Sequence, residues 1–189
     1  LDPDDPLGAL RAFSGRDLRV DAGRVNDRLF LNNVSLGLYA RLVHRRERHR
    51  RRREAFARLR ALGILLRRPS SLGVTVDGRP VAARVVVVAN NHYKLELLSV
   101  GERERLDEGR LHLYVAHGWL PTSWDDEPGE TFTIDARAGL LRGAVDGEPD
   151  ELETPLRFEI QPRALRVLIP AGGEHLTRVR ASELLRGDL

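Results

Sequence analysis

The chain has 189 residues, of which 41% are hydrophobic and 31% charged, a composition typical of a globular domain rather than a disordered chain. No apolar run approaches the roughly 20 residues of a membrane-spanning helix. The absence of cysteine excludes disulfides and thiolate metal sites. The net charge of +3 comes from arginine, because Lys94 is the only lysine. The sequence has no methionine and begins with Leu1, so we expect a piece of a longer protein.

Three elements are predicted in the first third of the chain. Residues 1–15 predict a short helix, because leucine and phenylalanine recur there at helical spacing. Two strands are expected over 18–31, with a turn near Asn26. The range 38–66 then predicts a helical insertion with two apolar patches. Between the patches, residues 44–53 contain no apolar side chain and are expected to be solvated.

Strands dominate the prediction from residue 69 onward. Asp77–Gly78 predicts the turn of a hairpin between 72–76 and 81–89. Residues 85–88 are continuously apolar, as in a strand buried on both faces. Further strands, spaced by about 8–15 residues as in a sandwich or barrel, are expected over 111–116, 131–136, 140–145, 156–161 and 165–169.

The predicted fold is therefore mainly β and sandwich-like, with an inserted basic helical region and short terminal helices. We expect the β-rich domain to span residues 16–172, with the insertion at about 38–66. Residues 173–189 predict an amphipathic tail helix. Its apolar face needs a partner, so the isolated chain could expose this surface or form a homodimer.

The strongest candidate site is Val145-Asp146-Gly147-Glu148. Alternate residues of a strand share a face, so Asp146 and Glu148 would direct two carboxylates to one place. Such a pair can hold a divalent cation, or separate its pKa values so that one member acts as a base. The same residues also predict an ordinary β-turn, which Pro149 supports, and the spacing alone favours that turn.

Two further segments carry candidate side chains. Asp107 and Glu108 adjoin Gly109 and could bind a cation through side chains and carbonyl oxygens, although a solvated turn is favoured. Asn32 and Asn33 follow an apolar run. Because asparagine is unfavourable within strands, these side chains either face a cleft or cap a strand-to-helix turn, and both alternatives stay open.

The polar stretch of the insertion predicts either a solvated helix face or a surface for anionic lipid, where each arginine contributes about 1 kcal/mol. Nucleic acid would suit the charge equally well, but no aromatic residue between Tyr39 and Phe56 offers a base-stacking platform. The chain also lacks the common glycine-rich nucleotide loops. The arginines concerned are Arg45, Arg46, Arg48, Arg50, Arg51, Arg52 and Arg53.

Short motifs follow one another in a distinctive order: Val20–Asn26, Phe30–Gly37, Arg45–Leu62, Val76–Gly78, Asn90, Leu106–Gly109, Val145–Glu148 and Pro162–Pro170. In this order they resemble the middle and end of the soluble diacylglycerol kinase-like and sphingosine kinase-like lipid kinases. No single motif is specific, and the order carries the resemblance over about residues 1–170. Two segments and one residue depart from it. Many members have a Gly-Gly-Gly stretch and a Pro-x-Ala segment, where this sequence has Tyr93–Leu98 and then Gly101-Glu102-Arg103-Glu104. Glu108 replaces an aspartate.

The resemblance implies that this is the β-rich, lipid-binding domain of a two-domain enzyme. The nucleotide-binding domain with its G-G-D-G-T loop does not occur in this sequence. Residues 1–15 would lie at the junction with that domain, and residues 173–189 would pack on it.

The resemblance also implies roles for the candidate residues. Asp146 would be the general base that takes the proton from a lipid hydroxyl, and Glu148 would help to organise Mg²⁺. Asp107 and Glu108 would form a structural cation site. The asparagine pair would contact substrate.

The expected function is thus the lipid-binding half of an ATP-dependent lipid kinase, with Mg²⁺ as cofactor and ATP held mainly by the other domain. The fragment alone is expected to be inactive. Expected partners are a lipid alcohol and an anionic membrane surface, without nucleic acid, at the cytoplasmic periphery of a membrane. The alternative is a non-catalytic β domain that binds an anionic membrane surface. A free-standing hydrolase that uses Asp146 and Glu148 is disfavoured, because no substrate-positioning set is visible.

Overall fold

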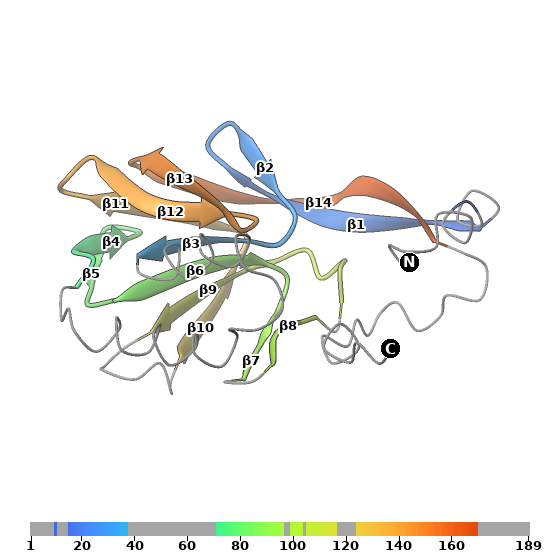
Figure 1. The fold of residues 1–189 in the computed structure, drawn as a ribbon, viewed down its shortest axis with the longest axis horizontal. Helices are drawn as coiled ribbons and strands as arrows, with labels where there is room; N and C mark the ends of the chain where they lie inside the picture. The colour runs from blue at the N-terminus through green and yellow to red at the C-terminus, as the bar shows by residue number, and fades with distance from the viewer. Residues whose placement is uncertain are drawn as a thin grey trace, which may run out of the picture.

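The computed structural model of the protein describes residue 10 and residues 15–37, 71–96, 99–103, 105–116 and 124–169. Within these ranges the chain forms two six-stranded antiparallel sheets and a separate two-stranded one (Figure 1). The predicted mainly-β fold is therefore confirmed. The helical insertion, the arginine run, the tail helix and nearly all of the predicted first helix lie outside the described residues.

One sheet, called the β1 sheet here, has the strand order β2–β1–β14–β11–β4–β5. Each pair in it is antiparallel. Its strands are β1 (Arg16–Val25), β2 (Arg28–Phe30), β4 (Val74–Val76), β5 (Arg79–Val81), β11 (Thr131–Ala136) and β14 (Leu156–Ile169).

The other large sheet, called the β6 sheet, has the order β10–β9–β6–β3–β12–β13. Its strands are β3 (Asn33–Gly37), β6 (Val85–Asn90), β9 (Leu111–Ala116), β10 (Trp124–Gly129), β12 (Leu140–Val145) and β13 (Glu148–Glu153). The two-stranded sheet pairs β7 (Lys94–Glu96) with β8 (Ser99–Glu102).

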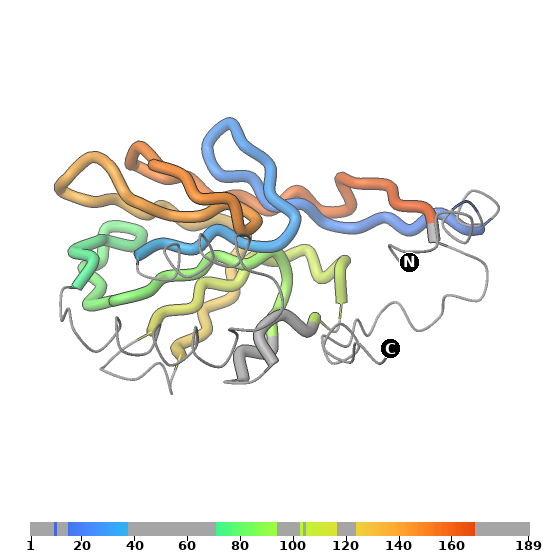
Figure 2. Tube along the Cα trace, in the orientation of Figure 1, coloured from blue at the N-terminus to red at the C-terminus, as the bar shows by residue number. Residues whose placement is uncertain are grey.

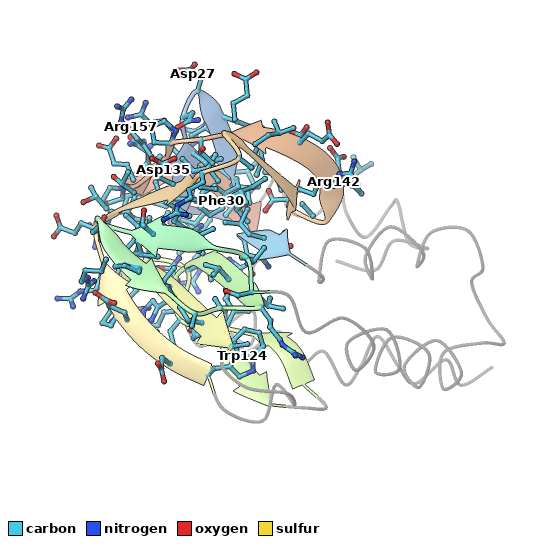
Figure 3. The ribbon with its side chains drawn as sticks, turned by 90° about the vertical axis from the view of Figure 1, so that its left-hand side faces the viewer. Asp27, Phe30, Trp124, Asp135, Arg142 and Arg157 are labelled. Atoms are coloured by element: carbon cyan, nitrogen blue, oxygen red, sulfur yellow. The ribbon has the colours of Figure 1, made fainter. Side chains whose placement is uncertain are left out.

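The two large sheets share one hydrophobic core. Apolar residues alternate with polar ones along β11, where Phe132 and Ile134 are buried and Thr131, Thr133 and Asp135 are exposed. Phe30 and Phe158 of the β1 sheet meet edge to face, with ring centroids 6.3 Å apart. Figure 3 shows Phe30 inside the molecule and Asp27 at an outer tip. The same core takes side chains such as Val88 from the β6 sheet, so the architecture is a sandwich.

Two predicted strand boundaries were wrong. The hairpin that turns at Asp77–Gly78 pairs β4 with the short strand β5 and ends there. The apolar run from Val85, predicted as part of this hairpin, forms β6 in the other sheet. The run is buried at every position, as predicted. The two strands expected over 156–161 and 165–169 form a single strand, β14, with an irregular register opposite Val20 and Ala22. In Figure 2 this strand and β1 run side by side beyond the rest of the fold.

The sequence analysis missed the outer strands of the β6 sheet. β10 and β13 are its edges, and each carries a proline and several acidic residues. Charge and proline are typical of edge strands, because they discourage pairing with another chain. Among the described residues, no helix is long and apolar enough to cross a bilayer.

Candidate functional site

Three hairpin turns share one arrangement, and one of them contains the main candidate residue. Each turn begins with an Asn or Asp in the left-handed region, at φ of 50°, 47° and 50°. Its backbone N–H donates to the carbonyl of a residue on a third strand, and its side chain accepts the N–H of that same residue. The pairs are Asn26 with Arg157, Asp77 with Thr133, and Asp146 with Asn33.

Asp146 binds more of the backbone than its two counterparts do. Its Oδ1 accepts the N–H groups of Asn32 and Asn33, at 2.7 and 3.1 Å. Its Oδ2 accepts the N–H of Leu31 at 2.7 Å. The residue is exposed, so Oδ2 keeps a lone pair that can accept another hydrogen. Asp146 is thus an accessible carboxylate held by three consecutive amides.

Strand periodicity does not place Glu148 on the face of Asp146, although the sequence predicted that it would. Asp146 and Gly147 form the turn between β12 and β13, so the period of two does not apply to them. Glu148 begins β13, and its side chain is 81% exposed. Its Oε2 lies 3.3 Å from Nη2 of Arg28, which also contacts Asp150 at 2.7 Å. The favoured turn interpretation was therefore the better one.

The two asparagines lie beside Asp146, but no helix follows them directly. Asn33 is the first residue of β3 and pairs with Ala89, so the predicted strand-to-helix cap is wrong. Asn32 is exposed, and its Oδ1 accepts a hydrogen bond from Nη2 of Arg103.

Sequence reasoning missed Arg103. Its Nη1 donates to the carbonyl oxygens of Leu31, at 2.9 Å, and Asn90, at 3.4 Å. Its guanidinium carbon lies 4.8 Å from the centre of the Tyr93 ring, a cation–π distance. No local pattern could have revealed this position, because the contacts with Leu31 cross 72 residues of sequence.

The acidic segment does not form a converging pair of carboxylates. Asp107 Oδ1 lies 3.2 Å from Nε of Arg105. Glu108 Oε2 accepts the N–H of His92 at 3.0 Å, and its Oε1 lies 3.4 Å from Nε2 of His112. In the described ranges no group of three or more His, Cys, Asp or Glu residues could hold a metal ion. The His92 N–H thus occupies one oxygen of Glu108, and cation binding by Asp107 and Glu108 stays a prediction.

The acidic segment is joined to a buried polar cluster in the β6 sheet. His112 is buried, and its Nδ1 lies 2.8 Å from Oδ1 of Asp126. The neighbouring Tyr114 hydroxyl accepts the N–H of Tyr93 at 2.9 Å. Burial raises the pKa of Tyr114 above its ordinary value, with smaller effects from Asp126 and Glu108. The phenol therefore stays neutral.

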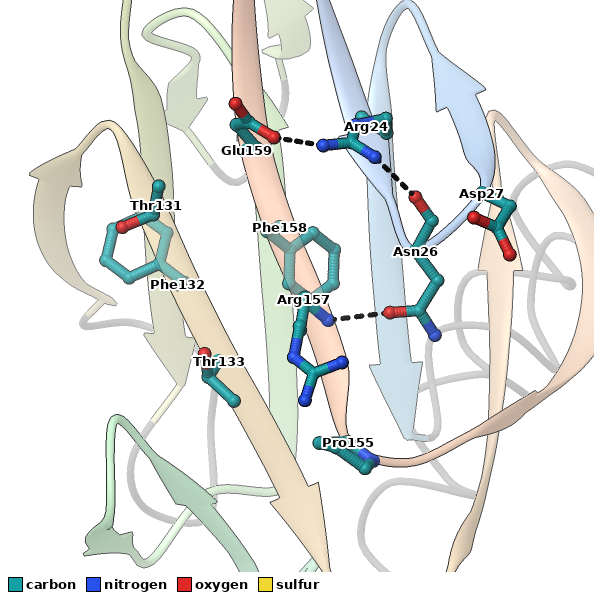
Figure 4. A pocket seen from close by; sticks show the side chains of 10 residues that line it. All are labelled: Arg24, Asn26, Asp27, Thr131, Phe132, Thr133, Pro155, Arg157, Phe158 and Glu159. Atoms are coloured by element: carbon teal, nitrogen blue, oxygen red, sulfur yellow. Dashed lines mark hydrogen bonds and ion pairs between the residues drawn. The ribbon is translucent and has the colours of Figure 1, made fainter.

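A pocket lies elsewhere, on the outer face of the β1 sheet (Figure 4). Its volume is about 600 Å³, and an Arg24–Glu159 ion pair lies along its rim. Asp146 does not line it. The lining residues are Arg24, Asn26, Asp27, Thr131, Phe132, Thr133, Pro155, Arg157, Phe158 and Glu159.

A second opening, of about 290 Å³, lies between the edge strands β5 and β10. Its wall includes the core residues Leu113 and Val115. Arg79 and Glu127 meet across it at 3.0 Å. This opening reaches the apolar space between the sheets.

No protein-family model matches the chain, but solved structures share its fold. A protein of Bacillus anthracis str. Sterne, provisionally named a diacylglycerol kinase, matches with a TM-score of 0.58 at 17% identity, over 89% of this chain and 63% of that one. A second such protein gives a TM-score of 0.54 at 19% identity, over 82% and 56% of the two chains. A diacylglycerol kinase of the same organism gives 0.51 at 16% identity, over 82% and 55%. The chain therefore has the fold of about half to two thirds of these proteins.

Proposed function

We propose that this chain is the lipid-binding half of an ATP-dependent lipid kinase, and that Asp146 is its general base. The observation that carries the proposal is the shared fold, which extends over 82–89% of the chain. The order of the motifs along the sequence supports it independently. Because the chain matches only 55–63% of those proteins, the activity would belong to a longer protein.

The chemistry asks two things of Asp146. Its carboxylate must stay in one place, and one oxygen must be able to take a proton. The amides of residues 31–33 meet the first need, and the free lone pair of Oδ2 meets the second. The O–H bond of the lipid alcohol would break as its proton moves to Oδ2. The alcohol oxygen would then bond to the γ-phosphorus of ATP as the bond to ADP breaks.

The other candidates have supporting roles in this proposal. Asn32 would contact the substrate, and Asn33 would anchor β3 beside Asp146. Glu148 leaves Oε1 without a partner among the described residues and fits a water-mediated contact to Mg²⁺. When bound, Mg²⁺ would neutralise phosphate charge. The arginine run at 45–53 would bind an anionic membrane surface, and the protein would act at the cytoplasmic periphery of a membrane.

The test is transfer of labelled phosphate from ATP to a panel of lipid alcohols, by this chain and by a chain extended at its N-terminus. We expect activity only in the longer chain. Asp146→Asn should lower kcat by at least about 100-fold, because it removes the general base, while vesicle binding stays unchanged.

Asp77→Asn is the matched control, since Asp77 occupies an equivalent turn in the other sheet and binds Thr133 in the same way. It should leave kcat unchanged. Normal turnover by Asp146→Asn would contradict the base assignment. If neither chain transfers phosphate, the kinase proposal fails and a non-catalytic lipid-surface domain remains.

A further inference from the structure

Arg103 differs from the ion-paired arginines of the described residues in how it is held. It is half-buried and contacts two carbonyl oxygens, one amide oxygen and one aromatic ring. All of these partners are uncharged. Arg24, Arg28 and Arg79, by contrast, each pair with a carboxylate. Within the described part of the chain, Arg103 is therefore a fixed positive charge without a negative partner.

Arg103 also lies at the candidate site. It binds the carbonyl oxygen of Leu31, while Asp146 binds the N–H of the same residue. Both side chains also contact Asn32: Arg103 donates to its side-chain Oδ1, and the Asp146 carboxylate accepts its backbone N–H. The guanidinium and the carboxylate thus hold one short segment between them.

The hydrogen bonds of Arg103 leave part of the guanidinium available. A guanidinium has five N–H donors, and the bonds to Leu31, Asn90 and Asn32 use three of them. The Nε–H and one hydrogen of Nη2 remain. An N–H pair along one edge of a guanidinium matches two oxygens of a phosphate group.

We propose that Arg103 binds a phosphate group beside Asp146. The inference deepens the proposed kinase function, because it supplies a charge partner for the phosphate near the proposed base. The phosphate could belong to the nucleotide or to an anionic lipid headgroup. A rigid cation loses little freedom on binding, so the fixed contacts of Arg103 favour this role.

The experiment is an NMR titration of the ¹⁵N-arginine-labelled protein with inorganic phosphate. The spectra of the unchanged protein and of Arg103→Lys are compared first. The Nε–H resonance that is missing from the Arg103→Lys spectrum belongs to Arg103. We expect phosphate to shift this resonance saturably. Arg103→Gln, checked for an unchanged melting temperature, should weaken phosphate binding by about tenfold or more, as loss of a charged hydrogen-bond partner does.

The control is Arg142→Gln. Arg142 is exposed and pairs with Glu151, so this variant should bind phosphate as the unchanged protein does. Further titrations with ATP and with a soluble short-chain phosphatidic acid identify the source of the phosphate. An Arg103 resonance that no phosphate compound moves would overturn the inference. Because the readout needs no phosphoryl transfer, this result is separate from the fate of the kinase proposal.

Discussion

At the residue scale, Asp21 is buried, and its two carboxylate oxygens accept hydrogen bonds from backbone N–H groups. Its side chain accepts the N–H of Gly109 at 2.6 Å and the N–H of Arg163 at 2.7 Å. The backbone N–H of Asp21 donates to the carbonyl oxygen of Leu106, and its backbone carbonyl oxygen accepts a hydrogen bond from Nδ2 of Asn90. The residue therefore joins β1, the irregular part of β14 and the acidic segment. Nothing in its local sequence distinguishes it from a solvated aspartate, because every one of these partners is distant in the chain.

Asp21→Asn should lower the free energy of unfolding by about 1–3 kcal/mol, because one buried N–H would face an amide nitrogen and lose its acceptor. Urea denaturation measures the change. Asp17→Asn is the control, since Asp17 is half-exposed and lies 3.5 Å from Arg166. It should cost less than about 1 kcal/mol. Equal effects of the two variants would contradict the role given to Asp21.

At the element scale, the apolar strands were predictable and the edges were not. β9, β11 and β12 have the predicted bounds, because buried strands carry runs or alternations of apolar residues. β10 and β13 consist mainly of acidic residues and proline. Such residues are unfavourable in strands in general, yet suit a strand with one free side. Edge position is a property of the whole sheet, so local propensity could not show it.

Gly37 lies at the end of β3, where two backbone segments pack closely. Its φ is +93°, and a Cβ there would lie 2.5 Å from the carbonyl oxygen of Arg84. Gly37→Ala should therefore destabilise the protein by about 2–4 kcal/mol, from left-handed strain and overpacking together. Thermal unfolding measures the difference.

Gly139→Ala is the control for Gly37→Ala. Gly139 also has positive φ, +67°, but a Cβ there has nothing within 4 Å. It should lose only about 1–2 kcal/mol of left-handed strain. A Gly37→Ala protein as stable as the control would show that β3 can move away from Arg84 without cost.

At the scale of the whole molecule, the two sheets form one core, and we expect them to unfold together. The candidate site depends on the packing of the two sheets against each other. Asp146 and residues 31–33 belong to the β6 sheet or lead into it, while Leu31 directly follows β2 of the β1 sheet. The sequence pointed to Asp146, Asn32 and Asn33 through their order along the chain. It could not show that Glu148 points to Arg28 or that Arg103 reaches Leu31, because those contacts depend on how the strands pack.

Phe158→Ala should lower the free energy of unfolding by about 3–5 kcal/mol, the usual cost of removing a buried ring. Phe158 is 1% exposed and lies in the β1 sheet. Trp124 lies in the β6 sheet, and in a Trp119→Phe background its fluorescence reports on that sheet alone. If the sheets unfold together, the Trp124 unfolding midpoint should move to lower urea concentration, by the shift that corresponds to the whole loss of about 3–5 kcal/mol. A Trp124 midpoint that stays in place would mean that the sheets unfold separately.

Leu140→Ala provides the comparison, because Leu140 is 42% exposed. Its effect should stay within about 0.5 kcal/mol, as for most surface substitutions.

The amides around Asp146 have a consequence for the timing of any reaction there. The three N–H groups precede or begin β3, and β3 pairs with strands on both sides. The carboxylate is thus oriented when the sheet forms, before any ligand arrives. If Asp146 acts as the proposed base, substrate binding would need no free energy to reorient its carboxylate, which is the condition for effective electrostatic preorganisation.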